Sequence, residues 1–335
     1  MKIAIVGAGA IGGFLGARLA LAGEEVTCIA RGPNLAAIQA NGLKLIEEDG
    51  TKRHAPNVKG AQKMADAGVQ DVVLLTLKAH QVKDVLPDMR ALFGPDTVVV
   101  TMQNGIPWWY FHKLAGPWQG HAVESVDPGG IVAAHIEVER VIGSVVYPAS
   151  ELAAPGVIKV IEGNRFTLGE LDGAKSPRLE ALAQTLIHAG FKAPVSTDIR
   201  SEIWLKLWGN LSFNPISALT HATLVDICQF PLTRELAAAM MREAQVVAEK
   251  LGVRFKVSLD KRIAGAEAVG KHKTSMLQDV ESGRPLELEA LVGSVRELGR
   301  VTETPTPTVD AVYACVSLLA KTLGEQNGKL AVAAR

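Results

Sequence analysis

Short apolar runs alternate with helical repeats along the first part of the chain. Runs rich in Ile, Val, Leu and Ala predict buried parallel strands, and these occupy residues 3–6, 25–30, 72–77 and 97–102. Helical patterns fill residues 14–22 and 34–40, and a third helix is expected to start after Lys78 and to end before Pro87. Strands that alternate with helices in this way predict an α/β fold with a parallel sheet.

The pattern changes twice further along the chain. Residues 43–51 and 141–168 carry short strand-like runs broken by turn residues, which predict a hairpin and a small antiparallel extension. Long helical patterns dominate beyond Ser176. The 335 residues are enough for about two domains of roughly 150 residues each. We therefore predict a first domain over residues 1–197 and an all-α second domain over residues 198–335.

Three glycines end the first predicted strand with the spacing G-x-G-x-x-G. Gly7 permits a tight turn, Gly9 has no side chain to block a pyrophosphate, and Gly12 lets the next helix lie close to the strand. Free N–H groups at the start of that helix attract phosphate. The residues between the glycines complete the expected cofactor loop: Ala8, Ala10 and Ile11. The motif predicts a Rossmann dinucleotide-binding domain, with an ordinary tight turn as the alternative.

Composition limits the partners and the compartment. The 35 basic and 35 acidic residues cancel, which argues against nucleic acid or an anionic membrane and favours a small-molecule partner. Cys28, Cys228 and Cys315 are odd in number and lack metal-ligand spacing, so we expect reduced thiols in a cytoplasmic protein and no metal site. A secretory signal could explain the apolar N-terminal run, but glycines and Arg18 interrupt it.

The end of the second predicted strand indicates which cofactor binds. About twenty residues past the first glycine, an Asp or Glu would hold the ribose 2′-hydroxyl of NAD. Arg31 stands there instead, and its guanidinium could hold a 2′-phosphate through a forked, charge-assisted contact. The sequence therefore predicts NADP, unless Arg31 is only a solvated loop residue.

Polar and aromatic residues follow the next two strands, whose carboxyl ends should line the ligand crevice. Lys78 is either a neighbour of the cofactor or an exposed lysine at a helix start. Asn104 could donate to and accept from a ribose or nicotinamide, but Asn104-Gly105 is also a turn signal. The aromatic run at residues 108–111 either walls the substrate pocket or packs the domain.

One helix in the second half carries the candidate chemistry. At 100° per residue over residues 202–214, Lys206, Asn210 and Asn214 share a narrow stripe, while apolar residues cover most of the circumference. A helix with that composition is buried, so the stripe is not its solvent face. A desolvated ammonium beside two amides needs acceptors, which a ligand could supply. Pro215 is expected to end or kink the helix and leave Asn214 at an exposed terminus.

A second polar patch lies between residues 274 and 279 and contains Ser275. Glu287 follows, in the predicted first turn of a helix after Pro285. Acidic residues favour helix N-termini, so Glu287 is either a functional residue or an ordinary helix-start residue.

Five segments together make the chain resemble the ketopantoate reductase family, the NADPH-dependent 2-dehydropantoate 2-reductases. These segments are GAGAIG, TLKAHQ, QNG, KLWGNLSFNP and SMLQDVESGRPLELE. The resemblance implies an N-terminal Rossmann domain and a helical domain like that of 6-phosphogluconate dehydrogenase. It implies Lys206 as the catalytic general acid and Glu287 as an active-site glutamate near the cofactor. The substrate-binding positions that it implies are Asn210, Asn214 and Ser275. The NADP-binding positions that it implies are residues 7–12, Arg31, Lys78 and Asn104.

The implied reaction is hydride transfer from nicotinamide C4 to the carbonyl carbon of a 2-oxo acid, with Lys206 protonating the nascent alkoxide. The chain departs from the family pattern at Thr223-Leu224 and at His272, where asparagines can stand. Because Leu224 offers no amide, we expect a substrate with a more apolar tail than ketopantoate to be reduced faster. A reductase for another 2-oxo acid, a dehydrogenase for another hydroxy acid or polyol, and a non-catalytic NADP-binding sensor remain alternatives, and a homodimer is left open.

Overall fold

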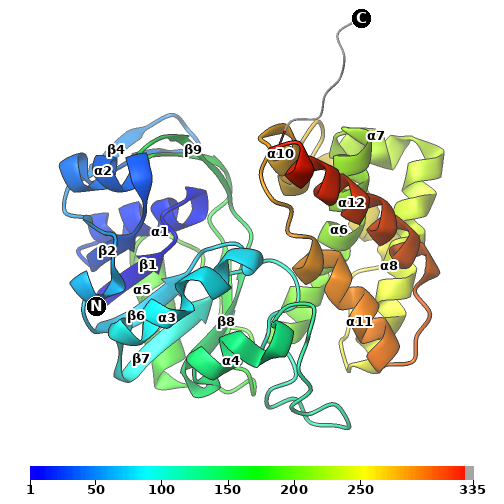
Figure 1. Cartoon of the computed structure of the whole chain (residues 1–335), viewed down its shortest axis with the longest axis horizontal. Helices are drawn as coiled ribbons and strands as arrows, with labels where there is room; N and C mark the ends of the chain where they lie inside the picture. Colours follow the sequence, from blue (N-terminus) through cyan, green and yellow to red (C-terminus); the bar gives the residue numbers. More distant parts are fainter. Residues whose placement is uncertain (329–335) are drawn as a thin grey trace, which may run out of the picture. The chain divides into compact units, whose positions relative to one another are not determined.

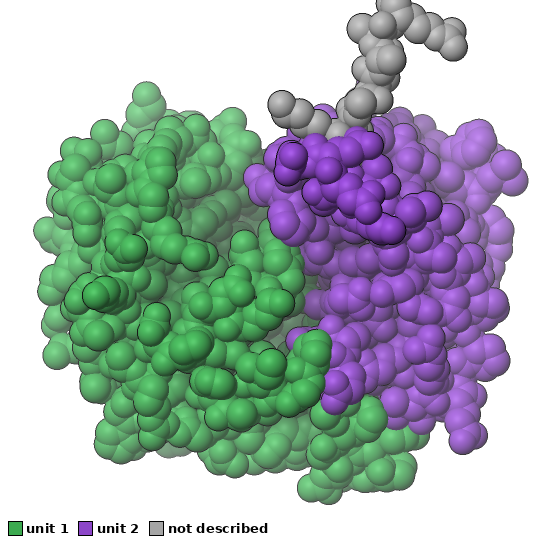
Figure 2. Space-filling model, viewed as in Figure 1, with its two compact units in different colours: residues 1–122, 127–202 green, residues 123–126, 203–335 purple. Residues whose placement is uncertain are grey.

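The computed structural model describes residues 1–328, which form two compact units (Figure 2). The first unit holds residues 1–122 and 127–202, and the second holds residues 123–126 and those from 203 onward. The first unit extends past the predicted Thr197 because the long helix α6 (Ile199–Thr220) begins in it. Ile199 packs against Gly169 so closely that a Cβ on this glycine would lie 2.8 Å from Ile199 Cβ.

The main sheet of the first unit has seven strands. Their spatial order is β11 (Phe166–Gly169), β8 (Val141–Val146), β7 (Phe93–Thr101), β6 (Gln70–Leu75), β1 (Lys2–Val6), β2 (Glu25–Ile29) and β5 (Lys59–Ala61). All neighbours are parallel except β11, which runs antiparallel to β8. The register pairs Val6 with Leu75 and Leu75 with Thr101, so the segments that follow β1, β6 and β7 leave the sheet at one edge. The four predicted parallel strands are confirmed.

A second sheet has four strands. Their order is β4 (Lys52–Ala55), β3 (Leu43–Ile46), β10 (Val157–Glu162) and β9 (Ala149–Ala154). The predicted hairpin forms β3 and β4, whereas the predicted antiparallel extension is divided between the two sheets. All six residues of β8 are buried, which suits the interior of the main sheet, and β9 is largely exposed at an edge. Helix α1 (Ala10–Leu21) contacts strands of both sheets (Figure 1).

Further helices of the first unit follow α1. Its α-helices, apart from the start of α6, are α2 (Gly32–Asn41), α3 (Leu86–Met89), α4 (Ile131–His135) and α5 (Pro177–His188), and the 3₁₀ helix η2 (Ala79–Val85) precedes α3. The prediction that the helix after Lys78 ends before Pro87 is wrong, because η2 runs directly into α3 with Pro87 in its first turn. Proline is tolerated there, since the first N–H groups of a helix have no partner within the helix.

The second unit is helical throughout its described residues. After α6 come α7 (Leu224–Gln229), α8 (Pro231–Lys250), α9 (Leu259–Ala268), α10 (Ser275–Glu281), the π-helical turn η6 (Glu289–Gly293), α11 (Ser294–Val301) and α12 (Pro307–Glu325). Residues 123–126 join this unit because the Glu297 carboxylate accepts hydrogen bonds from the backbone N–H groups of Glu124 and Ser125, both at 2.8 Å. The predicted Rossmann domain followed by an all-α domain is confirmed. Within residues 1–328 no helix is long and apolar enough to span a bilayer.

Helix α6 continues through Pro215, so of the predicted end or kink at this position the end is wrong. Asn214 is buried within the helix, with 5% of its surface exposed, and not at an exposed terminus. Pro215 removes one backbone hydrogen bond, but Ile216 and Ala218 beyond it are buried. Tertiary packing of this apolar face therefore outweighs the local cost of proline.

Candidate active site

The glycine turn connects β1 to α1, and its three glycines have different surroundings. Gly7 has a φ of +104°, and a Cβ on it would lie 2.8 Å from Leu77 Cδ2. A Cβ on Gly12 would lie 2.5 Å from Thr76 Oγ1. Gly9 begins α1, and a Cβ there would have no atom of the described residues within 4 Å. Protein packing explains Gly7 and Gly12, whereas the open face of Gly9 fits the close approach of a pyrophosphate.

Three side chains that the sequence did not single out hold this turn and the neighbouring strand ends. Thr76 Oγ1 donates to the carbonyl oxygen of Gly7 at 2.7 Å. Gln103 Nε2 donates to the carbonyl oxygens of Leu75 at 2.7 Å and Leu77 at 3.0 Å, which ties the end of β7 to that of β6. Asn34 Nδ2 donates to the carbonyl oxygen of Ala8 at 2.6 Å. Gln103 follows directly on the strand predicted over residues 97–102, a position that could have identified it, whereas Thr76 falls inside the strand predicted over residues 72–77 and follows only the observed β6.

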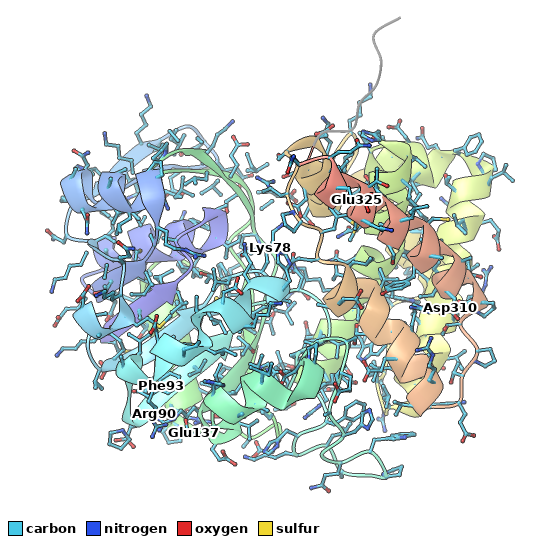
Figure 3. The ribbon with its side chains drawn as sticks, viewed as in Figure 1. Lys78, Arg90, Phe93, Glu137, Asp310 and Glu325 are labelled. Carbon is cyan, nitrogen blue, oxygen red and sulfur yellow. The ribbon has the colours of Figure 1, made fainter. Side chains whose placement is uncertain are left out.

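The predicted cofactor residues of the first unit share the carboxyl edge of the main sheet. Arg31 is exposed and caps α2, two residues after β2 ends. Lys78 is half-buried and caps η2 after β6 (Figure 3). Asn104 is half-buried beyond β7, and Gly105 has a φ of +90°, so this segment is a turn at the carboxyl edge of the sheet.

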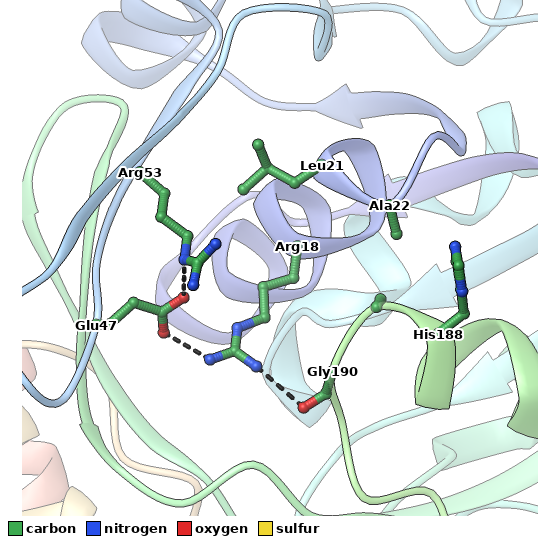
Figure 4. A pocket seen from close by; sticks show the side chains of 8 residues that line it. Arg18, Leu21, Ala22, Glu47, Arg53, His188 and Gly190 are labelled. Carbon is green, nitrogen blue, oxygen red and sulfur yellow. Dashed lines mark hydrogen bonds and ion pairs between the residues drawn. The ribbon is translucent and has the colours of Figure 1, made fainter.

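A cavity of about 250 Å³ lies elsewhere in the first unit, at the other end of α1 (Figure 4). Arg18 donates to the Glu47 carboxylate at 2.6 Å and to the Gly190 carbonyl oxygen at 3.0 Å, and Arg53 pairs with Glu47 at 3.0 Å. A helix of twelve residues is about 18 Å long, which separates this cavity from the glycine turn. These contacts brace α1 against its surroundings and do not belong to the nucleotide site.

Lys206 is the central candidate of the second unit. It lies half-buried on α6 beside Asn210, while Trp204, Leu207 and Trp208 of the same helix are buried. Burial lowers the pKa of the Lys206 ammonium to about 8, and the negative charge of Glu287 acts in the opposite direction. A lysine with that pKa is mostly protonated at pH 7 and gives up its proton more readily than an ordinary lysine.

Two of the predicted substrate-binding residues meet in the second unit. Asn214 Nδ2 donates to Ser275 Oγ at 3.4 Å, joining α6 to the start of α10. Thr274 caps α10 by accepting from the backbone N–H of Leu277 at 3.3 Å, which fixes the exposed Ser275 at the helix start. Amide and hydroxyl groups in this arrangement can orient a carboxylate or a hydroxyl of a ligand.

Glu287 does not lie in the first turn of a helix as predicted, because helical structure begins only at Leu288. Its side chain is buried, with 8% of the residue exposed. Preference for a helix start therefore does not explain Glu287, whereas its negative charge acts on Lys206 and raises the pKa of that ammonium.

The two departures from the family pattern lie side by side. The backbone N–H of Leu224 donates to the carbonyl oxygen of His272 at 3.0 Å. The Thr223 hydroxyl is hydrogen-bonded to the Asp226 carboxylate, which caps α7. The two substitutions therefore change one local surface of the second unit.

The aromatic run divides into two kinds of residue. Trp109, Tyr110 and Phe111 are almost completely buried, and Trp109 Nε1 donates to Thr101 Oγ1 at 2.9 Å. Of the two alternatives for the aromatic run, packing of the domain therefore applies to these three residues. Trp108 is only half-buried and differs from its neighbours.

Fold and site together define a two-domain oxidoreductase of the dinucleotide-binding class. Two models describe the ketopantoate reductase PanE/ApbA family, and they match residues 3–115 and, for its C-terminal part, residues 198–320. A 2-dehydropantoate 2-reductase from Mesorhizobium japonicum is 57% identical over 96% of this chain and 98% of its own length. The chain belongs to the ketopantoate reductase family, as its motifs predicted.

Solved structures agree with this assignment. A protein from Ralstonia solanacearum MolK2, provisionally named a ketopantoate reductase, is 43% identical with a TM-score of 0.91, covering 96% of this chain and 98% of its own. A 2-dehydropantoate 2-reductase from Geobacter metallireducens is 29% identical with a TM-score of 0.82. The match covers 97% of this chain and 99% of the other. Both matches extend over the Rossmann and the helical parts of the fold.

Proposed function

We propose that the protein reduces 2-dehydropantoate (ketopantoate) to pantoate with NADPH. The observation that carries the proposal is Lys206, an ammonium with a pKa lowered to about 8 on an otherwise apolar helix that also bears Asn210 and Asn214. Support also comes from the activity named for the 57% identical relative and from Arg31 at the position that favours NADP over NAD.

Each residue has a distinct part in the proposed reaction. NADPH, when bound, supplies the hydride for the carbonyl carbon of the substrate. Lys206 stabilises the negative charge that develops on the carbonyl oxygen and donates its proton to that oxygen. The substrate's carboxylate and hydroxyl ends are oriented by Asn210, Asn214 and Ser275.

The cofactor is held by residues that follow the strands of the main sheet. The loop of Gly7, Ala8, Gly9, Ala10, Ile11 and Gly12 binds the pyrophosphate at the start of α1. Arg31 binds the 2′-phosphate. Lys78, Asn104 and Glu287 contact the cofactor on the side of the reacting nicotinamide.

A spectrophotometric assay of NADPH oxidation tests the proposal. Ketopantoate and a panel of branched and aromatic 2-oxo acids are each offered at saturating NADPH. Leu224 led us to expect faster reduction of an acid with a more apolar tail, but the activity named for the 57% identical relative favours ketopantoate. We therefore expect a kcat/KM for ketopantoate at least equal to that of the other acids. A clear preference for another 2-oxo acid would reassign the substrate, and binding of NADPH without turnover of any acid would favour the non-catalytic sensor.

We further propose that the enzyme works in the cytoplasm on a small-molecule substrate, as a monomer or a homodimer. Cys28, Cys228 and Cys315 are free thiols, which supports a reducing compartment. Light scattering coupled to gel filtration measures the oligomeric state, and fractionation of cells that express the protein tests the compartment.

A further inference from the structure

Asn34 connects three segments of the first unit through its side-chain amide. It stands in the first turn of α2, three residues after Arg31. Its Nδ2 donates to the carbonyl oxygen of Ala8 in the glycine turn at 2.6 Å. Its Oδ1 accepts from the backbone N–H of Gly156, in the turn between β9 and β10, at 2.8 Å. A backbone carbonyl only accepts and a backbone N–H only donates, so the two partners fix the orientation of the amide.

The carbonyl groups of the glycine turn are held in different ways. The carbonyl oxygen of Gly7 accepts from the N–H of Gly9 at 2.8 Å, and that of Gly9 accepts from the N–H of Gly13 at 2.7 Å. Both bonds join neighbouring residues of the turn and of the start of α1. The carbonyl oxygen of Ala8 between them is held by Asn34, a side chain 26 residues away in the sequence. Part of the shape of this turn is therefore set from α2.

The bond to Ala8 acts at the point where the backbone is least constrained. Glycine restricts its own backbone little, and Gly7 and Gly9 flank Ala8. The Ala8 carbonyl and the Gly9 N–H belong to one planar peptide group, so they turn together. Helix α1 begins directly after this group, Gly9 offers it no side-chain cap, and its first N–H groups have no acceptor within the helix. Asn34 thus holds the peptide group that precedes the N–H groups available to an anion.

Asn34 is itself anchored by the turn between β9 and β10. The carbonyl oxygen of Gly156 accepts from the N–H of Lys44 at the start of the second sheet's β3, at 2.8 Å. A Cβ on Gly156 would lie 3.1 Å from the Cβ of Ala37, so this turn packs closely on α2. Both ends of the amide are therefore fixed in the protein itself, which lowers the cost of ordering the glycine turn when a ligand binds.

We propose that Asn34 is a positioning residue for the cofactor, which holds the glycine turn in the conformation that binds the pyrophosphate of NADPH. This inference rests on the proposed function, in which residues 7–12 bind the pyrophosphate and Arg31 binds the 2′-phosphate. The first turn of α2 then serves both ends of the site. Arg31 meets the 2′-phosphate directly, whereas Asn34 acts on the pyrophosphate through Ala8.

Three ligands separate these two contributions. NADPH carries the 2′-phosphate and the pyrophosphate, NADH carries only the pyrophosphate, and 2′-AMP carries only the 2′-phosphate. Asn34→Ala should raise the Kd of NADPH and of NADH equally, by about 3- to 10-fold, the range for one neutral hydrogen bond, and leave the Kd of 2′-AMP unchanged. Arg31→Ala should show the complementary pattern, with weaker binding of NADPH and 2′-AMP and unchanged binding of NADH.

Asn164→Ala is the matched control. Its Nδ2 donates to the carbonyl oxygen of Gly190 at 3.2 Å, at the other end of α1, so this variant also loses one bond from an amide to a backbone carbonyl. All three Kd values should stay as in the wild type. Calorimetry measures the Kd values, and denaturant melts compare the stability of the variants.

Two results would overturn the inference. If Asn34→Ala weakens 2′-AMP as much as NADPH, the side chain holds α2 and not the glycine turn. If NADPH and NADH bind as in the wild type, the turn keeps its conformation without Asn34. These are binding measurements, so a failure of the proposed reaction and a failure of this inference are separate results.

A second variant covers the case in which Asn34→Ala does not fold. The carboxylate of Asn34→Asp still accepts from the N–H of Gly156 but cannot donate to Ala8. At high salt, which screens the added charge, it should again weaken NADPH and NADH more than 2′-AMP. An equal effect on all three ligands, or on none, would overturn the inference.

Discussion

Glu287 and Lys206 form an electrostatic pair within the helical unit, in which the carboxylate raises the pKa of an ammonium that burial lowers to about 8. The burial of Lys206 was predicted from its apolar helix, whereas the effect of Glu287 is not visible in the sequence, where the two residues stand far apart. The balance sets the pH range over which Lys206 can donate a proton. Lys206 carries its proton below pH 8 and loses it above, so activity should fall on the alkaline side.

The first prediction concerns that alkaline limit. Glu287→Gln removes the negative charge that favours the ammonium, so the pKa of Lys206 should fall below about 8. The alkaline limb of the kcat/KM profile for ketopantoate should therefore move to lower pH. Glu281→Gln is the control, since Glu281 pairs with the exposed Lys273. If the alkaline limb lies at the same pH in the wild type and in Glu287→Gln, the charge of Glu287 does not set the pKa of Lys206.

The glycine turn gives a prediction that separates stability from binding. Gly9→Ala adds a methyl group to open space at a φ of −76°, so the free energy of unfolding should change by less than about 1 kcal/mol while NADPH affinity falls. Gly12→Ala forces a methyl group against the carbonyl oxygen of Gly7 and against Thr76 Oγ1, and it should cost at least about 1 to 3 kcal/mol of stability. Denaturant melts and NADPH titrations measure both. Unaltered NADPH affinity in Gly9→Ala would argue against pyrophosphate at this turn.

Arg31 carries the prediction about cofactor choice. Arg31→Ala should weaken NADPH binding by about 1.5 to 3 kcal/mol, or roughly 10- to 150-fold, because it removes hydrogen bonds to a charged phosphate. NADH lacks that phosphate, so its affinity should hardly change. Arg90→Ala, another exposed arginine of the first unit, serves as the control. Equal losses for NADPH and NADH would show that Arg31 does not recognise the 2′-phosphate.

The strands and the glycine turn could be predicted because their cause is local. An apolar run such as residues 3–6 has few alternatives to a buried strand, and the glycine spacing reports a backbone requirement. The course of α6 through Pro215 could not be predicted, because packing of distant residues decided it. The division of residues 141–168 between two sheets likewise depends on which partners bury β8.

In the candidate site, too, only the features with a local cause could be predicted from the sequence. The stripe of Lys206, Asn210 and Asn214 followed from helix geometry alone. The contact between Asn214 and Ser275 and the burial of Glu287 depend on how separate helices pack, which no spacing in the sequence reveals. The Trp108 N–H, which has no acceptor within residues 1–328, belongs to this second kind, since the sequence could not distinguish Trp108 from Trp109.

The most direct test of the account is the turnover number of Lys206→Ala with ketopantoate at saturating NADPH. Loss of the proton donor should lower kcat by about 100- to 10,000-fold, the usual contribution of a general acid. NADPH binding, followed by fluorescence titration, should remain as in the wild type, which shows that the protein is still folded. A near-normal kcat with only a raised KM would mean that Lys206 binds the substrate and does not protonate it.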